Sequence, residues 1–160
     1  MSMEDLSLIL WRERELLDLL VFKLEQQQLV LASGRTRWLA MAAGEVQTVL
    51  ENIKEAELLR AMAADAAAAS IGLECNPSLR ALAEAAEEPW KLILIDHRDA
   101  FLAYTSQIIE MAGSNHDLLT AGYQAVRETL MLLGDGTSGY APDGSAVVEN
   151  PRQRLLDRNM

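Results

Sequence analysis

Few side chains of this 160-residue chain could carry catalysis or bind a metal ion, and they are widely spaced. His97 and His116 are the two histidines. Helical bundles that hold two metal ions use Glu-x-x-His, but Leu94 and Gly113 stand three residues before these histidines. The carboxylates match no spacing typical of a metal site. We therefore expect no metal, and we interpret His97 as a core histidine and His116 as a polar residue in a helix's first turn.

Nucleotide binding and covalent catalysis have equally weak support. The segment Gly134–Gly139 matches G-x-G-x-x-G, which in dinucleotide-binding proteins follows a strand and opens a helix. Here it follows a predicted helix, so we interpret it as a flexible hinge. Cys75 has Glu74 beside it, a neighbour that disfavours the reactive thiolate. No serine elbow and no HExxH segment is present, and we expect neither an enzyme nor a cofactor.

Composition and charge indicate a helical protein that does not bind nucleic acid. The chain has 27 Leu and 23 Ala against 14 Val plus Ile, and 5% of its residues are aromatic. Leu and Ala favour helices, whereas strands prefer β-branched and aromatic residues. The net charge of −10 would repel a phosphate backbone. Without a signal peptide or an unbroken apolar run of about 18 residues, we expect a cytoplasmic protein with no stable membrane insertion.

Glycine and proline positions predict two long helices first. Gly34 separates a helix over 4–33 from a second over 36–70. Both carry apolar residues at helical spacing. The apolar residues of the first helix are Leu6, Leu10, Leu16, Leu17, Leu20, Leu24 and Leu31, and those of the second are Leu39, Ala42, Val46, Val49, Ile53, Ala56 and Leu59. The short joint predicts an antiparallel hairpin.

Shorter helices are expected after the hairpin, over 77–86, 88–112 and 114–133. The dipeptide Asn76-Pro77 starts the first of them, and Gly113 ends the second. Ser114 or Asn115 caps the third. The predicted fold is thus all-α, a long antiparallel helical hairpin plus shorter C-terminal helices, as in a helical bundle or coiled coil. The predicted domains are a helical domain over 1–134 and a flexible C-terminal tail over 135–160.

The predicted apolar faces are wider than a hairpin alone can bury. They either close into a bundle or form a groove that holds a helix of another protein. Closed packing by itself would account for most of them.

Several short segments share their order and spacing with one known family. They are residues 10–17 (LWRERELL), 20–24 (LVFKL), 34–40 (GRTRWLA) and 57–60 (ELLR), the pairs Pro89-Trp90 and His97-Arg98, and residues 140–144 (YAPDG). Together they resemble the FlgN family of bacterial flagellar export chaperones. The resemblance covers about residues 4–145.

The resemblance implies a cytosolic chaperone of the flagellar type III secretion apparatus. Its clients would be the hook-filament junction proteins, also called hook-associated proteins. The chaperone would shield their amphipathic terminal helices and deliver them to export-gate and ATPase components. An alternative function is a structural coiled-coil or bundle adaptor without client handover. The sequence leaves open whether the chain is a monomer or a homodimer.

The resemblance also suggests which residues act. In the family the C-terminal part is tied to client binding, so we predict a client surface on the last helix. Its residues are Leu118, Leu119, Tyr123, Val126, Leu130 and Leu133, which could equally be the core of a four-helix bundle. A tail tyrosine in a Tyr-x-x-x-Gly pattern is implicated in docking on the export gate. Here that pattern is Tyr140 with Gly144.

Overall fold

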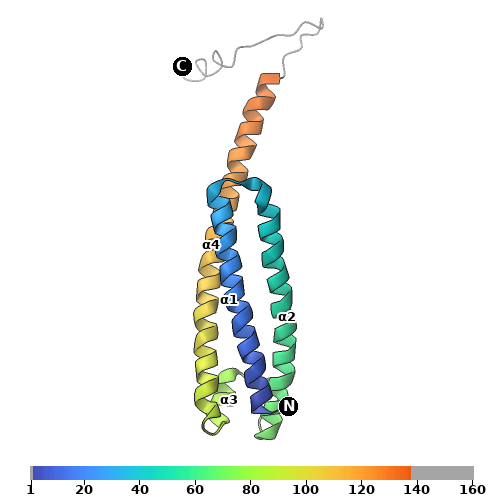
Figure 1. The fold of residues 1–160 in the computed structure, drawn as a ribbon, viewed down its shortest axis with the longest axis vertical. Coiled ribbons are helices and arrows are strands. Elements are labelled where there is room, and N and C mark those ends of the chain that lie inside the picture. Colours follow the sequence, from blue (N-terminus) through green and yellow to red (C-terminus); the bar gives the residue numbers. More distant parts are fainter. Residues whose placement is uncertain (1, 138–160) are drawn as a thin grey trace, which may run out of the picture. The chain divides into compact units, whose positions relative to one another are not determined.

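The computed structural model describes residues 2–137, and helices are the only regular elements in that range (Figure 1). They are α1 (Met3–Ser33), a 3₁₀ turn η1 (Thr36–Trp38), α2 (Leu39–Ser70), α3 (Leu79–Ala85) and α4 (Trp90–Thr137). The predicted all-α class with a long hairpin is confirmed. None of these helices is long and apolar enough to cross a membrane.

The chain divides into two units, residues 1–118 and 119–160. Unit 1 contains α1, α2, α3 and the first part of α4. Of the second unit, the structure describes residues 119–137, all within α4. The predicted domain boundary at residue 134 stays a prediction.

Helices α1 and α2 form the expected antiparallel hairpin. Ser2 caps α1 by accepting a hydrogen bond from the Asp5 amide, and the Asp5 carboxylate accepts one from the Ser2 amide at 2.7 Å. These bonds from Ser2 lower the pKa of Asp5. Gly34 ends α1 in the left-handed conformation, φ +68°, which glycine adopts without strain. The turn η1 then reverses the chain into α2.

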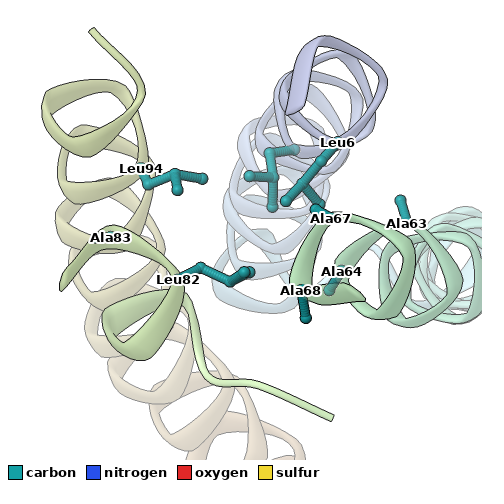
Figure 2. Packing of buried hydrophobic residues seen from close by; sticks show 9 residues of the cluster. Leu6, Ala63, Ala64, Ala67, Ala68, Leu82, Ala83 and Leu94 are labelled. Carbon is teal, nitrogen blue, oxygen red and sulfur yellow. The ribbon is translucent and has the colours of Figure 1, made fainter. Parts of the chain in front are cut away.

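One apolar cluster closes unit 1 at the end of the hairpin where α3 lies (Figure 2). Leu82 of α3 and Leu94 of α4 are completely buried there beside Leu6 of α1. The facing residues of α2 are Ala63, Ala64, Ala67 and Ala68. Because alanine side chains are short, α2 contributes little volume to this cluster, which the leucines of α1, α3 and α4 fill.

A second apolar cluster lies farther along the hairpin. It consists of Leu16, Leu20 and Leu24 of α1 with Val49, Ile53 and Ala56 of α2, and Ile108 and Met111 of α4 pack against it. The predicted leucine stripe of α1 is thus confirmed as far as Leu24. Leu59 was predicted to face the core but is exposed. The buried side of α2 passes from Ala56 through Arg60, which pairs with the buried Glu13, to Ala63. Leu59 precedes Arg60 and therefore lies about 100° around the helix from it.

Helix α4 is one helix of 48 residues, so the prediction of two helices separated at Gly113 is wrong. Neither Ser114 nor Asn115 caps a helix. Instead, Asn115 Nδ2 donates to the Leu24 carbonyl of α1 at 2.9 Å, and Gln28 Nε2 donates to Ser114 Oγ at 2.9 Å. A glycine inside a helix lowers helix stability by only about 1 kcal/mol relative to alanine. The hydrogen bonds of Ser114 and Asn115 to α1 offset this loss. His116 accordingly lies within α4 and not in a first turn.

Two smaller boundaries also differ from the prediction. The N-cap of α3 is Ser78, whose Oγ accepts from the Ala81 amide at 3.0 Å, whereas Asn76 adopts a positive φ of 58° before it. At the other end, α4 continues through Thr137, so the first residues of the predicted tail are helical. The rest of that tail lies outside the described residues.

Candidate partner-binding surface

The last part of α4 carries an apolar stripe, the α4 stripe, at the spacing of a helix face. Leu119, Tyr123, Val126, Leu130 and Leu133 follow one another at steps of four and three residues, which places them on one side of the helix. All six predicted client-binding residues, Leu118 included, are exposed, by between 38% and 69% of their surface. Thr129 lines a surface pocket together with Val126 and Leu130, and its hydroxyl donates to the Ala125 carbonyl at 2.9 Å.

Such a surface can bind another amphipathic helix. Single exposed leucines are ordinary, but a stripe of leucine, valine and tyrosine at heptad-like spacing is the pattern by which one helix packs against another. The tyrosine adds a large apolar area with a polar tip. The two residues predicted to dock on the export gate, Tyr140 and Gly144, lie outside the described residues.

Within unit 1, α4 is attached to α1 by a buried polar cluster around His97. His97 is completely buried, as predicted. Its Nδ1 lies 3.4 Å from Arg14 Nη1 and its Nε2 lies 3.4 Å from Ser7 Oγ. The ring of Trp11 meets the imidazole edge-on at 5.0 Å between centroids. Burial, together with the Arg14 charge, lowers the pKa of His97, so the ring is neutral at pH 7.

Further bonds repeat along the same pair of helices. Arg14 donates to Asp96 at 2.7 Å, and the Tyr104 hydroxyl donates to Asp18 at 3.2 Å. Burial and the bond to Asp18 raise the pKa of Tyr104. Because later residues of α1 pair with later residues of α4, the two helices run parallel. These bonds fix the register of α4 and therefore the place where its exposed part begins.

The buried ion pair between α1 and α2 was missed by the sequence analysis. Arg60 Nη1 donates to Glu13 Oε1 at 2.9 Å, and Glu13 is almost fully buried. Its other oxygen, Oε2, has no hydrogen-bond partner among the described residues. Burial raises the pKa of Glu13 even though Arg60 opposes the shift. The signal was present, since Glu13 is three residues from both Leu10 and Leu16 on the buried stripe.

A pocket of about 370 Å³ opens between α2, α4 and residues 76–80, which include the first residues of α3. We call it the arginine pocket because Arg60, Arg80 and Arg98 line it. The other lining residues are Glu57, Ala61, Ala64, Asp65, Asn76, Pro77, Ser78, Leu79, Phe101, Leu102 and Thr105. No linear motif could reveal it, because its walls come from three separate segments.

Across residues 2–137, no three His, Cys, Asp or Glu side chains gather as a metal site would require. Cys75 is exposed and free. The two buried groups with a shifted pKa, His97 and Glu13, are held between helices by the Arg14 and Arg60 side chains. The α4 stripe is the feature that a function must explain.

Two curated proteins match part of this chain. The Dynamin-binding protein of Canis lupus familiaris is 36% identical over 86 residues, and that of Homo sapiens is 34% identical over 74 residues. These matches cover 53% and 46% of this chain but only 5% of each relative. They therefore assign no activity to this chain. No solved structure matches it.

A family match agrees with both the sequence and the fold. Residues 1–147 match the FlgN protein family, a range that includes every described residue and extends into the C-terminal segment. The matched range contains the long helical hairpin that glycine positions and apolar spacing predicted. The chain belongs to the FlgN family.

Proposed function

We propose that this protein is a cytoplasmic chaperone that binds hook-filament junction proteins before their export. Family membership supports the general role of a flagellar export chaperone. The finer proposal is that the α4 stripe covers an amphipathic terminal helix of the client. The chaperone would then deliver the client to the export gate.

The observation that carries this proposal is the exposure of the α4 stripe. A client helix with its own apolar face would bury both stripes, with roughly 25 cal/mol gained per Å² of apolar surface removed from water. Delivery also requires release, so the complex must be reversible. A dissociation constant between about micromolar and nanomolar, roughly −8 to −12 kcal/mol, meets both requirements.

Titration calorimetry with C-terminal segments of the junction proteins from the same genome tests the client surface. The unmodified chain should bind one segment in that affinity range. Leu130→Asp should weaken binding about 100-fold, because it places a charge in an apolar contact worth roughly 3 kcal/mol. Leu8→Asp is the matched control, since Leu8 is an equally exposed leucine on α1. Absence of any complex with the unmodified chain would refute the proposal.

Docking on the export gate is assigned to Tyr140 and Gly144 on the family resemblance. Tyr140→Ala should leave the affinity for the client segment unchanged and should block export of the junction proteins in cells. Loss of client binding in this variant would show that the division between client binding and gate docking is wrong.

A further inference from the structure

Helix α1 carries a second apolar stripe, on the side that faces away from the core of unit 1. Leu8 lies two residues from the buried Leu6 and Leu10, which places it about 200° around the helix from them. Phe22 stands in the same relation to its buried neighbours. The exposed apolar residues of this side are Leu8, Trp11, Leu19, Phe22 and Leu29, with between 40% and 69% of their surface exposed. Within unit 1, this side of α1 is therefore left uncovered.

The exposed side of α1 follows a heptad repeat. Its residues are Leu8, Trp11, Glu15, Asp18, Phe22, Glu25 and Leu29, at alternating steps of three and four, and we call them the α1 seam. This is the spacing at which one helix packs along another in a coiled coil. The seam is about 32 Å long at a rise of 1.5 Å per residue. A second helix of similar length therefore fits it.

The polar residues of the α1 seam are all acidic. Glu15 and Asp18 stand between Trp11 and Phe22, and Glu25 follows Phe22 by three residues. A helix that covered the apolar residues of the seam would therefore bring its own seam residues close to three carboxylates. Lysine or arginine at those positions would make attractive contacts, whereas acidic residues would be repelled.

The acidic excess remains when the cations beside the seam are counted. Each of these cations already has a carboxylate partner: Arg12 pairs with Glu15 at 3.5 Å, Arg14 with Asp96 at 2.7 Å, and Lys23 with Glu45 at 3.0 Å. Asp18 accepts a hydrogen bond from the neutral Tyr104 hydroxyl at 3.2 Å. Within residues 2–137, neither Asp18 nor Glu25 takes part in an ion pair. Two carboxylates of the seam thus keep a negative charge that no neighbouring cation offsets.

We propose that the α1 seam is a docking site for a basic amphipathic helix of another protein. Apolar side chains of that helix, at heptad spacing, cover Trp11 and Phe22. Lysine or arginine residues among them meet the carboxylates of the seam. The site lies on α1 and shares no residue with the α4 stripe, so it does not depend on the proposed client surface.

A second copy of this chain fits the α1 seam poorly. In a parallel pair each seam residue meets its counterpart, which places Glu15 against Glu15. In the antiparallel register that brings Trp11 against Phe22, Glu15 meets Asp18. Like charges that face each other across a helix pair oppose association. A basic helix replaces each of these repulsions by an ion pair.

Two synthetic helical peptides test the charge preference of the seam. Both carry leucine opposite the apolar residues of the seam. Opposite its three carboxylates, one peptide carries lysine and the other glutamate. In calorimetry with the full chain, the lysine peptide should bind with a dissociation constant of about 10 µM, and the glutamate peptide should bind at least about tenfold more weakly.

Charge reversal on the seam should exchange this preference. Glu15→Lys combined with Glu25→Lys should weaken binding of the lysine peptide about tenfold and strengthen binding of the glutamate peptide. Both side chains are exposed, so the fold is preserved. The matched control is Glu51→Lys combined with Glu55→Lys, which makes the same change in net charge at two exposed carboxylates of α2.

Phe22→Ala tests the apolar part of the seam. It should weaken binding of the lysine peptide about tenfold, because an exposed aromatic side chain in the middle of the contact is lost. Leu58→Ala, at an exposed leucine of α2, should leave the affinity unchanged. Leu130→Asp in the α4 stripe should also leave it unchanged.

Four results would overturn the docking site. The first is no binding of the lysine peptide to the unmodified chain. The second is equal affinity for the two peptides, or equal losses in the two double lysine variants, since the peptide would then respond only to net charge. In the third, Leu130→Asp abolishes binding, which would place the peptide on the α4 stripe. In the fourth, sedimentation of the chain alone shows a dimer that Phe22→Ala dissociates, and a second copy would then occupy the seam.

Discussion

The two parts of α4 share one helix and one apolar repeat but differ in what their apolar side chains contact. In residues 90–118, Leu94 and His97 are completely buried and Asn115 is almost so, and all three meet other helices of unit 1. In residues 119–137, every large apolar side chain whose environment is described is exposed. Helical periodicity therefore shows which side of a helix is apolar, and it does not show whether the chain itself covers that side.

The two parts of α4 also differ in the bonds that their polar side chains make. The first part has side chains that bond to α1, namely Asp96, Tyr104, Ser114 and Asn115. Their positions fix one register of α4 on α1. In the exposed part, Thr129 turns its hydroxyl back to its own helix, which leaves an apolar surface suited to a removable partner.

The largest effect expected from this comparison is on folding stability. Leu94→Ala should lower the free energy of unfolding by about 2–5 kcal/mol, because it leaves a cavity in the cluster shared with Leu6 and Leu82. Leu130→Ala, the same change on the exposed stripe, should stay within about 0.5 kcal/mol. Urea unfolding followed by far-ultraviolet circular dichroism, which reports on the helices of both units, measures both. Equal losses would show that the two parts of α4 are buried alike.

A smaller loss is expected at Asn115. Asn115→Ala removes the bond to the Leu24 carbonyl and the 3.2 Å bond to Gln27 Oε1, which should cost about 1–3 kcal/mol. Ser114→Ala is the neighbouring control, because it loses one bond from the partly buried Gln28 and should cost less. A larger loss at Ser114 would contradict the assignment of Asn115 as the residue that anchors α4.

The sequence predicts the features of this fold that neighbouring residues determine, but not those that depend on residues far apart in the chain. The hairpin was predictable because Gly34 and the leucine stripe are local signals, and the apolar side of the last helix was predictable for the same reason. The continuity of α4 was not, because whether Asn115 caps a helix or bonds to Leu24 is decided by a residue 91 positions away. The arginine pocket was likewise hidden, since its parts meet only after folding.

The pH dependence of the unfolding free energy should show the contribution of His97. We expect this effect to be smaller than the loss caused by Asn115→Ala. Burial lowers the folded-state pKa of His97 below its ordinary value of 6.5. As the pH falls below 6.5, His97 is protonated in the unfolded chain but stays neutral in the folded chain. The free energy of unfolding therefore decreases. His97→Gln should flatten the pH profile of the unfolding free energy over this range. If the unfolding free energy of His97→Gln depended on pH as strongly as that of the unmodified chain, the buried imidazole would not be the neutral group assigned here. NMR titration of the imidazole ring protons checks the same assignment directly.

The smallest effect expected comes from two helical glycines, one in each part of α4. A methyl group added at Gly113 or at Gly122 meets no atom within 4 Å, so alanine fits at both. Alanine should favour the helix by up to about 1 kcal/mol at either position. All three tryptophans, Trp11, Trp38 and Trp90, lie in unit 1, so their fluorescence follows the unfolding of that unit alone.

Gly113→Ala should raise the unfolding midpoint seen by tryptophan fluorescence, because residue 113 is part of the segment that unfolds with α1. Gly122→Ala should leave that midpoint unchanged and raise only the helical circular dichroism signal. If Gly122→Ala also raised the fluorescence midpoint, residues 119–137 would unfold together with unit 1. The α4 stripe would then be stabilised by the chain itself, and it would lose the independence that a reversible client surface requires.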